Sequence, residues 1–148
     1  MLSSDVSAAL DPLYAYVSER RNTAMLGRGI CFNKYTGSRG KGGCNDAEPE
    51  FIAKIRRIMD EDGVNYQTSE LGKVDQGGGG TIAYVLANLN MSVVDAGVPV
   101  LSMHAPMEVV SKVDVYEAYL AYKAFHKFVK SVEKKRRHQN SSAVCALV

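Results

Sequence analysis

The fold of this chain is decided by the stretch ELGKVDQGGGGTIAYVLANLNMSVVDAGVPVLSMHAP, Glu70–Pro106. Four consecutive glycines, Gly77 to Gly80, stand before a helical pattern over residues 81–88. Short apolar runs typical of buried strands follow between residues 93 and 101, and the chain then reaches His104. A histidine just past a buried strand, facing a glycine-lined helix start, is where an α/β protein would build a site.

Helical and strand-like patterns alternate along most of the chain. The predicted strands are the end of a core strand at 1–5, then 29–36, 64–68, 93–94 and 98–101, with a flexible basic loop at 37–43. One predicted helix begins near Pro49 and stops at Gly63, with a stripe of Phe51, Ile55, Ile58 and Met59. The last begins near Glu108, with Val109, Val113, Tyr116, Leu120, Ala124 and Phe128 on one face. This alternation predicts a three-layer α/β architecture, a sheet with flanking helices. The chain opens with no start signal for a domain, so we expect that neighbouring strands precede it.

Bulk composition limits the classes of function. The chain has 148 residues, about one domain, and a net charge of +2. Its positive charge gathers in Lys134–Arg137, so the remainder gives little support for nucleic-acid binding. Three scattered cysteines indicate a reducing compartment, and no apolar run reaches the ~20 residues of a membrane span. We therefore expect a cytoplasmic protein whose residues 1–133 form the folded part.

Three features of the chain could carry chemistry, and each also has an ordinary reading. His104 has the chemistry of a zinc ligand, yet a lone histidine is more often a hydrogen-bonded structural residue. Asp5 could equally cap a helix over residues 6–10. The glycine run could cradle an anion, but Thr81-Ile82 follows it where a phosphate loop needs a Lys-Ser/Thr pair. A tight turn that lets backbones pack closely explains the glycines as well.

Two separate motifs resemble the zinc aminopeptidase family that includes aspartyl aminopeptidase and vacuolar aminopeptidase I. LSSDVSAALDP, residues 2–12, resembles the family segment whose aspartate binds one zinc, which implies that Asp5 is a metal ligand. LSMHAP, residues 101–106, resembles the segment whose histidine binds the other zinc, which implies the same of His104. The two motifs occur in the family's order, and the resemblance extends to about Phe128.

The resemblance implies removal of the N-terminal residue of a peptide by a water held between two zinc ions. Metals of this kind lower the pKa of the water and polarise the scissile carbonyl, while a carboxylate serves as general base. The family pattern places an early histidine, an aspartate that bridges both metals, an adjacent glutamate pair that supplies the base and a ligand, and an inserted dimerisation domain upstream of Asp5. We therefore expect the C-terminal portion of a catalytic domain, inactive alone, from an enzyme that forms a homo-oligomer.

Substrate contacts follow from the same resemblance. The glycine loop lies beside the substrate in the family, which makes Gly80 and Thr81 candidate contacts. Lys34 lies close to where the aspartyl branch has a substrate-pocket lysine, although a solvated strand edge explains it equally. That branch also has a histidine three residues after the ligand aspartate; Ala8 stands there in this chain, which puts acidic specificity in doubt.

The tail from Lys134 to Val148 departs from the family pattern. It is basic and then small and apolar, and we expect it to be disordered. Its end, Cys145-Ala146-Leu147-Val148, has the shape of a prenylation box, with valine an unusual last residue. Without that modification we expect no membrane partner. The alternative to a peptidase portion is a non-catalytic truncated product or an interaction module of an oligomeric peptidase.

Overall fold

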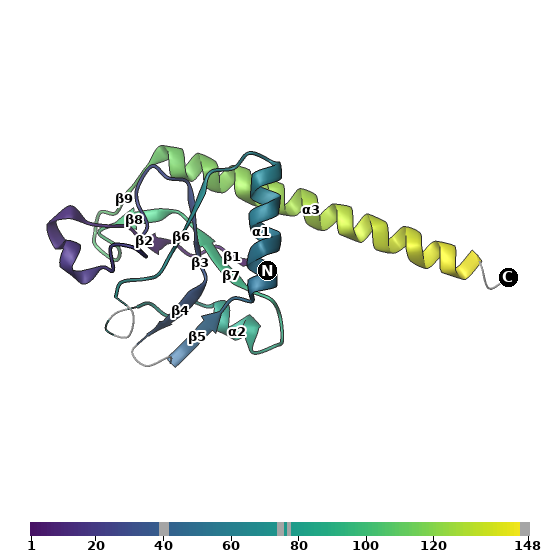
Figure 1. The fold of residues 1–148 in the computed structure, drawn as a ribbon, viewed down its shortest axis with the longest axis horizontal. Coiled ribbons are helices and arrows are strands. Elements are labelled where there is room, and N and C mark those ends of the chain that lie inside the picture. The colour runs from purple at the N-terminus through teal and green to yellow at the C-terminus, as the bar shows by residue number, and fades with distance from the viewer. Residues whose placement is uncertain (39–41, 74–75, 77, 146–148) are drawn as a thin grey trace.

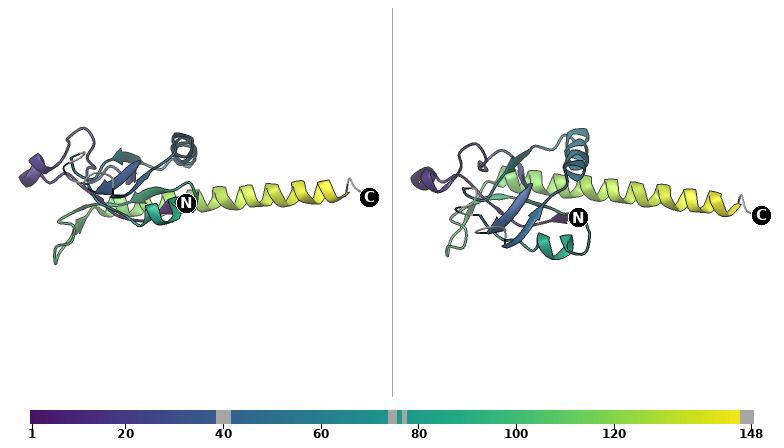
Figure 2. Two further views of the ribbon diagram at one scale, coloured as in Figure 1. Left: turned by 90° about the horizontal axis from the view of Figure 1, so that it is seen from below. Right: turned by 60° about the horizontal axis from the view of Figure 1, so that its bottom comes forward.

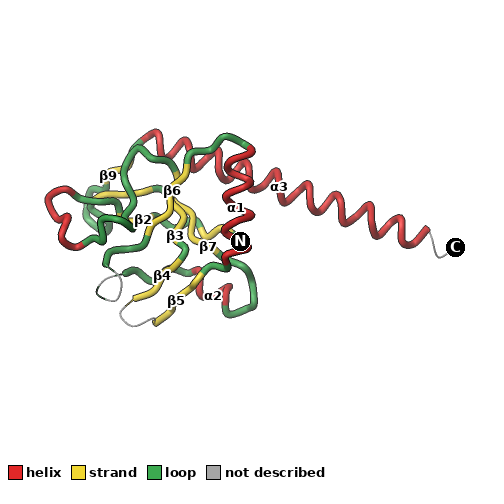
Figure 3. Tube along the Cα trace, viewed as in Figure 1, coloured by secondary structure: helices red, strands yellow, loops and turns green. Residues whose placement is uncertain are grey.

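The structure is a computed structural model that describes residues 1–38, 42–73, 76 and 78–145, with the backbone alone at 38, 42 and 138–145. Strands and helices alternate, as Figures 1 and 3 show. The strands are β1 (Leu2–Ser3), β2 (Ser7–Ala8), β3 (Ile30–Asn33), β4 (Tyr35–Ser38), β5 (Gly42–Asp46), β6 (Tyr66–Ser69), β7 (Val94–Gly97), β8 (Pro99–Leu101) and β9 (Val109–Val110). The helices are α1 (Pro49–Glu61), α2 (Ala83–Ala87) and α3 (Lys112–Cys145), with a 3-10 helix η1 (Pro12–Val17). The predicted α/β class is confirmed.

The main sheet has four strands in the order β1-β7-β3-β6. β1 runs parallel to β7 and β3 parallel to β6, whereas the central pair β3 and β7 is antiparallel. A second sheet, β2-β8-β9, and a hairpin of β4 and β5 complete the strand pairing of the described residues. The later part of the segment at residues 70–106 therefore meets the first residues of the chain, because β1 pairs with β7 and β2 with β8.

One face of the main sheet packs on α1 and α3. Alternating residues of a strand point to opposite faces. The core combines alternate residues of β3 and β7 with the buried stripe of α1 and three alanines of α3: Ile30, Phe32, Val94, Ala96, Ile55, Ile58, Met59, Ala118, Ala121 and Ala124. The α1 prediction is confirmed, including Gly63 just past its end, where a φ of +67° suits glycine.

The stripe predicted for the last helix is confirmed only in its second half, where Leu120, Ala124 and Phe128 pack against the core. The helix begins at Lys112 rather than near Glu108, and Val109 belongs to β9. Val113 and Tyr116 are 57% and 60% exposed, while Asp114 and Glu117 are buried. Asp114 accepts hydrogen bonds from two loop N–H groups, and Glu117 accepts from both nitrogens of Asn65. The apolar pattern was misleading at the start of α3, because the inward positions there hold carboxylates that accept hydrogen bonds from distant loops.

α3 also continues through the residues for which disorder was expected. It extends to Cys145 and projects well beyond the rest of the molecule, as Figures 1 and 2 show. Its sequence from Lys112 to Cys145 has no proline or glycine, and its lysine, arginine and alanine residues favour a helix. A division of the chain near residue 133 stays a prediction. Within the part of the chain that is described, no helix is both long and apolar enough to cross a bilayer.

Two further predicted segments have different limits in the structure. The strand expected at 29–36 is two strands, β3 and β4, separated by a bend at Lys34. The predicted loop at 37–43 lies partly outside the described residues, but its ends belong to the β4–β5 hairpin. The helix expected at 81–88 is shorter and begins at Ala83. These differences matter for the site, because both segments contain predicted substrate contacts.

Candidate functional site

Asp5 lies where the chain passes from β1 to β2, against β7. Its carbonyl oxygen is so close to Gly97 that a Cβ on that glycine would stand 1.8 Å from it. Only glycine permits this approach, so the local sequence fixes how Asp5 sits over the strand. The Asp5 Oδ1 accepts from the N–H of Val6 at 2.9 Å, and Oδ2 has no hydrogen bond to a described residue. The carboxylate therefore retains an oxygen with which to bind a ligand.

His104 lies in the turn that follows β8. Its φ of +68° is uncommon outside glycine, and its backbone N–H donates to Glu108 Oε1 at 2.6 Å. The side chain is exposed, and neither ring nitrogen has a hydrogen bond to a described residue. Such conformations persist where the surroundings hold them and occur often at functional sites.

The segments of Asp5 and His104 are neighbours in the fold, because β2 follows Asp5, β8 precedes His104, and these two strands pair. Carboxylate oxygen and imidazole nitrogen are both zinc ligands, and a catalytic zinc takes three protein ligands. Among the described residues no three His, Cys, Asp or Glu side chains gather to hold a metal. The chain thus contributes donors of the right chemistry but does not complete a zinc site from these residues.

Lys34 follows the last residue of β3, at the bend before β4. Its ammonium forms an ion pair with Asp46 of β5. Glu70 lies close by: burial raises the pKa of its carboxyl, and the charge of Lys34 opposes that increase. Lys34 is therefore engaged with carboxylates of this chain, and its role toward a substrate stays a prediction.

Gly80 and Thr81 come just before α2, and the structure separates their roles. Gly80 is exposed, with nothing within 4 Å of the place that a Cβ would occupy. Thr81 is 8% exposed, and its hydroxyl donates to Asp95 Oδ2 at 2.8 Å. Gly80 is therefore open to its surroundings, whereas the side chain of Thr81 faces inward, and the role of both toward a substrate stays a prediction.

A buried polar network that sequence analysis did not identify covers the face of the sheet opposite α1 and α3. Asn33 Oδ1 accepts from the hydroxyls of Ser7 at 3.1 Å and Ser69 at 2.8 Å. Cys31 Sγ lies 2.8 Å from the Ser69 hydroxyl, and burial raises the pKa of its thiol. The alternation of Ile30, Cys31, Phe32 and Asn33 between apolar and more polar side chains was the available signal.

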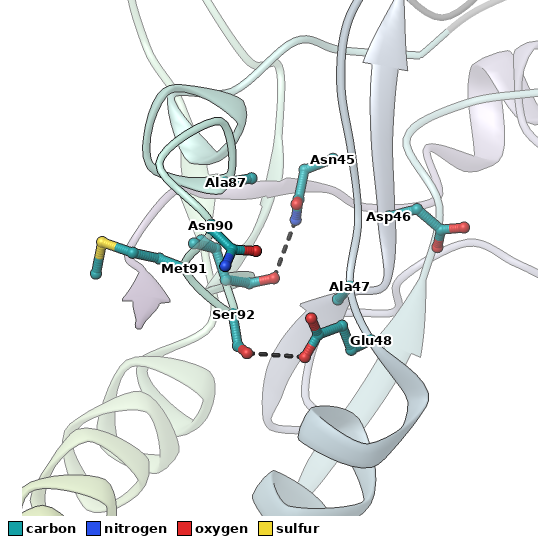
Figure 4. Close-up of a pocket in the computed structure, with 9 residues that line it drawn as sticks. Asn45, Asp46, Ala47, Glu48, Ala87, Asn90, Met91 and Ser92 are labelled. Atoms are coloured by element: carbon teal, nitrogen blue, oxygen red, sulfur yellow. Dashed lines mark hydrogen bonds between the residues drawn. The ribbon is translucent and has the colours of Figure 1, made fainter.

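One pocket of the structure is separate from these residues. It lies between β5, the start of α1 and the segment after α2, as Figure 4 shows. Two hydrogen bonds lie within it: Asn45 Nδ2 donates to the Val93 carbonyl at 3.0 Å, and the Ser92 hydroxyl to Glu48 Oε2 at 2.8 Å. None of the predicted site residues lines this pocket.

Comparison with known proteins gives consistent matches. The family described as aminopeptidase I zinc metalloprotease (M18) matches residues 1–126. A probable M18 family aminopeptidase 1 of Clostridium acetobutylicum is 68% identical over 117 residues, which are 79% of this chain and 25% of the relative. A Thermotoga maritima protein described in the same words is 48% identical over 119 residues, 80% of this chain and 26% of its own length.

Solved structures agree with the sequence matches. The crystal structure of aminopeptidase I from Clostridium acetobutylicum superposes with a TM-score of 0.81 at 66% identity, over 84% of this chain and 27% of that one. The M18 aminopeptidase from Thermotoga maritima gives 0.80 at 48% identity, over 83% and 27%. The chain thus spans about a quarter of the length of its relatives. Over the greater part of its own length, this chain belongs to the M18 family of zinc metalloproteases.

Proposed function

We propose that this chain is the C-terminal portion of a di-zinc aminopeptidase catalytic domain and contributes Asp5 and His104 as metal ligands. The observation that carries the proposal is the family match over residues 1–126, which contains both ligand motifs. Each residue keeps donor atoms without a hydrogen bond to a described residue, and their segments adjoin the paired strands β2 and β8. Zinc bound there would supply a water of lowered pKa and polarise the scissile carbonyl.

We propose further that the chain does not hydrolyse peptides by itself. The described residues do not bring together three metal-binding side chains, and the chain spans about a quarter of its relatives. The same proposal includes two zinc ions and a peptide substrate, with Lys34, Gly80 and Thr81 as substrate contacts. It also includes a complete enzyme that is a homo-oligomer located in the cytoplasm.

The first test measures zinc content and hydrolysis of leucyl-, aspartyl- and glutamyl-anilides with the purified 148-residue chain. We expect no turnover and about one zinc equivalent or less, reduced further by Asp5→Asn or His104→Ala. His126→Ala is the matched control, since His126 lies on α3 outside both motifs. Two bound zinc ions with chelator-sensitive turnover would show that this chain completes the site, contrary to the proposal.

A chimera tests the ligand roles inside a whole enzyme. In the Clostridium acetobutylicum relative, residues 1–126 of this chain would replace the matching segment. We expect zinc-dependent hydrolysis that Asp5→Asn or His104→Ala abolishes and His126→Ala retains. Hydrolysis that survives both ligand substitutions would exclude these residues as ligands.

A second candidate function is an interaction module of an oligomeric peptidase. Exposed apolar side chains favour it, since a large exposed apolar surface marks an interaction site. On η1 they are Leu13, Tyr14, Tyr16 and Val17, and around β9 and the start of α3 they include Met107, Val109, Val113, Tyr116 and Tyr119. Sedimentation velocity distinguishes this function: a monodisperse monomer across concentrations would count against it.

A further inference from the structure

A buried carboxylate on β7, Asp95, lies next to the segment that contains Gly80. In the sheet register Asp95 is opposite both Ser3 of β1 and Asn33 of β3, and all three side chains are at most 2% exposed. Because β-strand residues alternate, Asp95 points away from the face that Val94 and Ala96 present to α1 and α3. The carboxylate therefore belongs to the polar side of the sheet.

Asp95 is hydrogen-bonded to Thr81, and the Thr81 hydroxyl also contacts the neighbouring backbone and β4. The Thr81 hydroxyl donates to Asp95 Oδ2 at 2.8 Å and accepts from the N–H of Ala83 at 3.2 Å. It also lies 3.5 Å from the hydroxyl of Thr36 on β4. One buried hydroxyl thus ties together β7, β4 and the first residue of α2.

The glycine segment is constrained at its other side as well. Gly78 has a φ of +96°, and a Cβ there would stand 2.3 Å from the carbonyl oxygen of Gly37 on β4. Between this close contact and buried Thr81, Gly80 is exposed and has open space beside it. The hydrogen bonds of the Thr81 hydroxyl therefore set the position of the neighbouring Gly80 backbone.

The state of Asp95 argues against simple core packing. Its Oδ1 has no partner within hydrogen-bond distance among the described residues, nor has the Ser3 hydroxyl opposite it. Burial raises the pKa of the Asp95 carboxyl, and the hydroxyls of Ser3, Thr81 and Thr36 oppose that increase. A buried carboxylate costs free energy that an apolar side chain at the same place would not, even where hydroxyls offset part of that cost. A residue retained at such a cost is expected to serve a site rather than the stability of the sheet.

We propose that Asp95 is a positioning residue, which acts through Thr81 to place the backbone of Gly80 for contact with the substrate. The inference rests on the proposed function insofar as Gly80 faces the substrate. Asp95 itself contacts neither substrate nor metal in this scheme. Thr81 is an anchor, and the substrate contact is made by the main chain.

Nuclear magnetic resonance of the ¹⁵N-labelled 148-residue chain tests the proposal through the amides of Gly80 and Ala83. Thr81→Val removes the hydroxyl at nearly constant volume, and Thr81→Ser keeps it. In Thr81→Val we expect displaced Gly80 and Ala83 resonances and about tenfold faster hydrogen exchange at Ala83, the equivalent of one lost hydrogen bond. Thr81→Ser should restore the wild-type values.

Asp95→Ala should reproduce the resonances of Thr81→Val, and the double variant should add no further change at Gly80. The amide of Gly29, which donates to Asp114 elsewhere, is the internal reference for global stability. Unchanged Gly80 and Ala83 signals in Thr81→Val, no restoration by serine, or equal acceleration at Gly29 would each overturn the proposal. These measurements read neither zinc nor turnover, so their failure is distinguishable from failure of the proposed function.

Discussion

Substitution of Asp114 should destabilise the chain more than that of any exposed acid. Asp114 is fully buried in the first turn of α3, where its two oxygens accept from the N–H groups of Gly27 and Gly29, each at 2.7 Å. These two bonds fasten the loop before β3 to the helix that covers the sheet.

The expected magnitude follows from the contacts. A hydrogen bond to a charged group contributes about 1.5–3 kcal/mol, so two contribute roughly 3–6 kcal/mol. The negative charge near the helix N-terminus adds about 0.3–1 kcal/mol. Asp114→Ala should therefore remove a large part of a typical domain's stability of about 5–15 kcal/mol. Asp114→Asn keeps one acceptor and should lose about half as much.

Urea unfolding followed by circular dichroism measures the free energy of unfolding, and Glu133→Ala is the matched control. Glu133 lies on the same helix but is exposed, so its substitution should change stability by about 0.5 kcal/mol at most. The reasoning is refuted if Asp114→Asn unfolds at the same urea concentration as Glu133→Ala. Faster exchange of the Gly29 amide in Asp114→Asn would locate the loss at the predicted bond.

Three smaller predictions concern glycines and thiols. Gly29→Ala should prevent stable folding, because its Cβ would stand 2.0 Å from the Asn65 carbonyl oxygen. Gly27 has a similar φ but open space beside it, so Gly27→Ala should lower the free energy of unfolding by only about 1–2 kcal/mol, as measured by thermal melting. A thiol reagent followed by peptide mapping should modify Cys44 and leave buried Cys31 unmodified in the native chain; equal labelling would contradict the described burial. Burial in the folded state raises the pKa of the Cys31 thiol above its ordinary 9.0, so the folded chain holds this proton more tightly than the unfolded chain. The free energy of unfolding should therefore decrease as the pH increases past 9. Cys31→Ala should remove this contribution to the pH dependence.

Local patterns in the sequence were sufficient for the class of fold and for the family. The stripe of α1 and the alternation of strands and helices depend on neighbours within a few residues, and both are confirmed. The family could be identified from the residues of the two motifs around Asp5 and His104 and from the order of these motifs in the chain. That both residues bind metal remains a prediction, since the described residues show the two segments side by side and not a complete zinc site.

Long-range contacts decided the remainder, and no local pattern contains them. The apolar stripe predicted the wrong face only at the start of α3, over Val113 and Tyr116, because Asp114 and Glu117 accept hydrogen bonds there from N–H groups of loops far away in sequence. The glycine run predicted a close contact between backbone segments but did not identify the segment that Gly77 to Gly80 would contact. Only the tertiary structure shows that Gly97 admits the backbone of Asp5 and that Thr81 turns inward to Asp95, since each depends on which strands become neighbours.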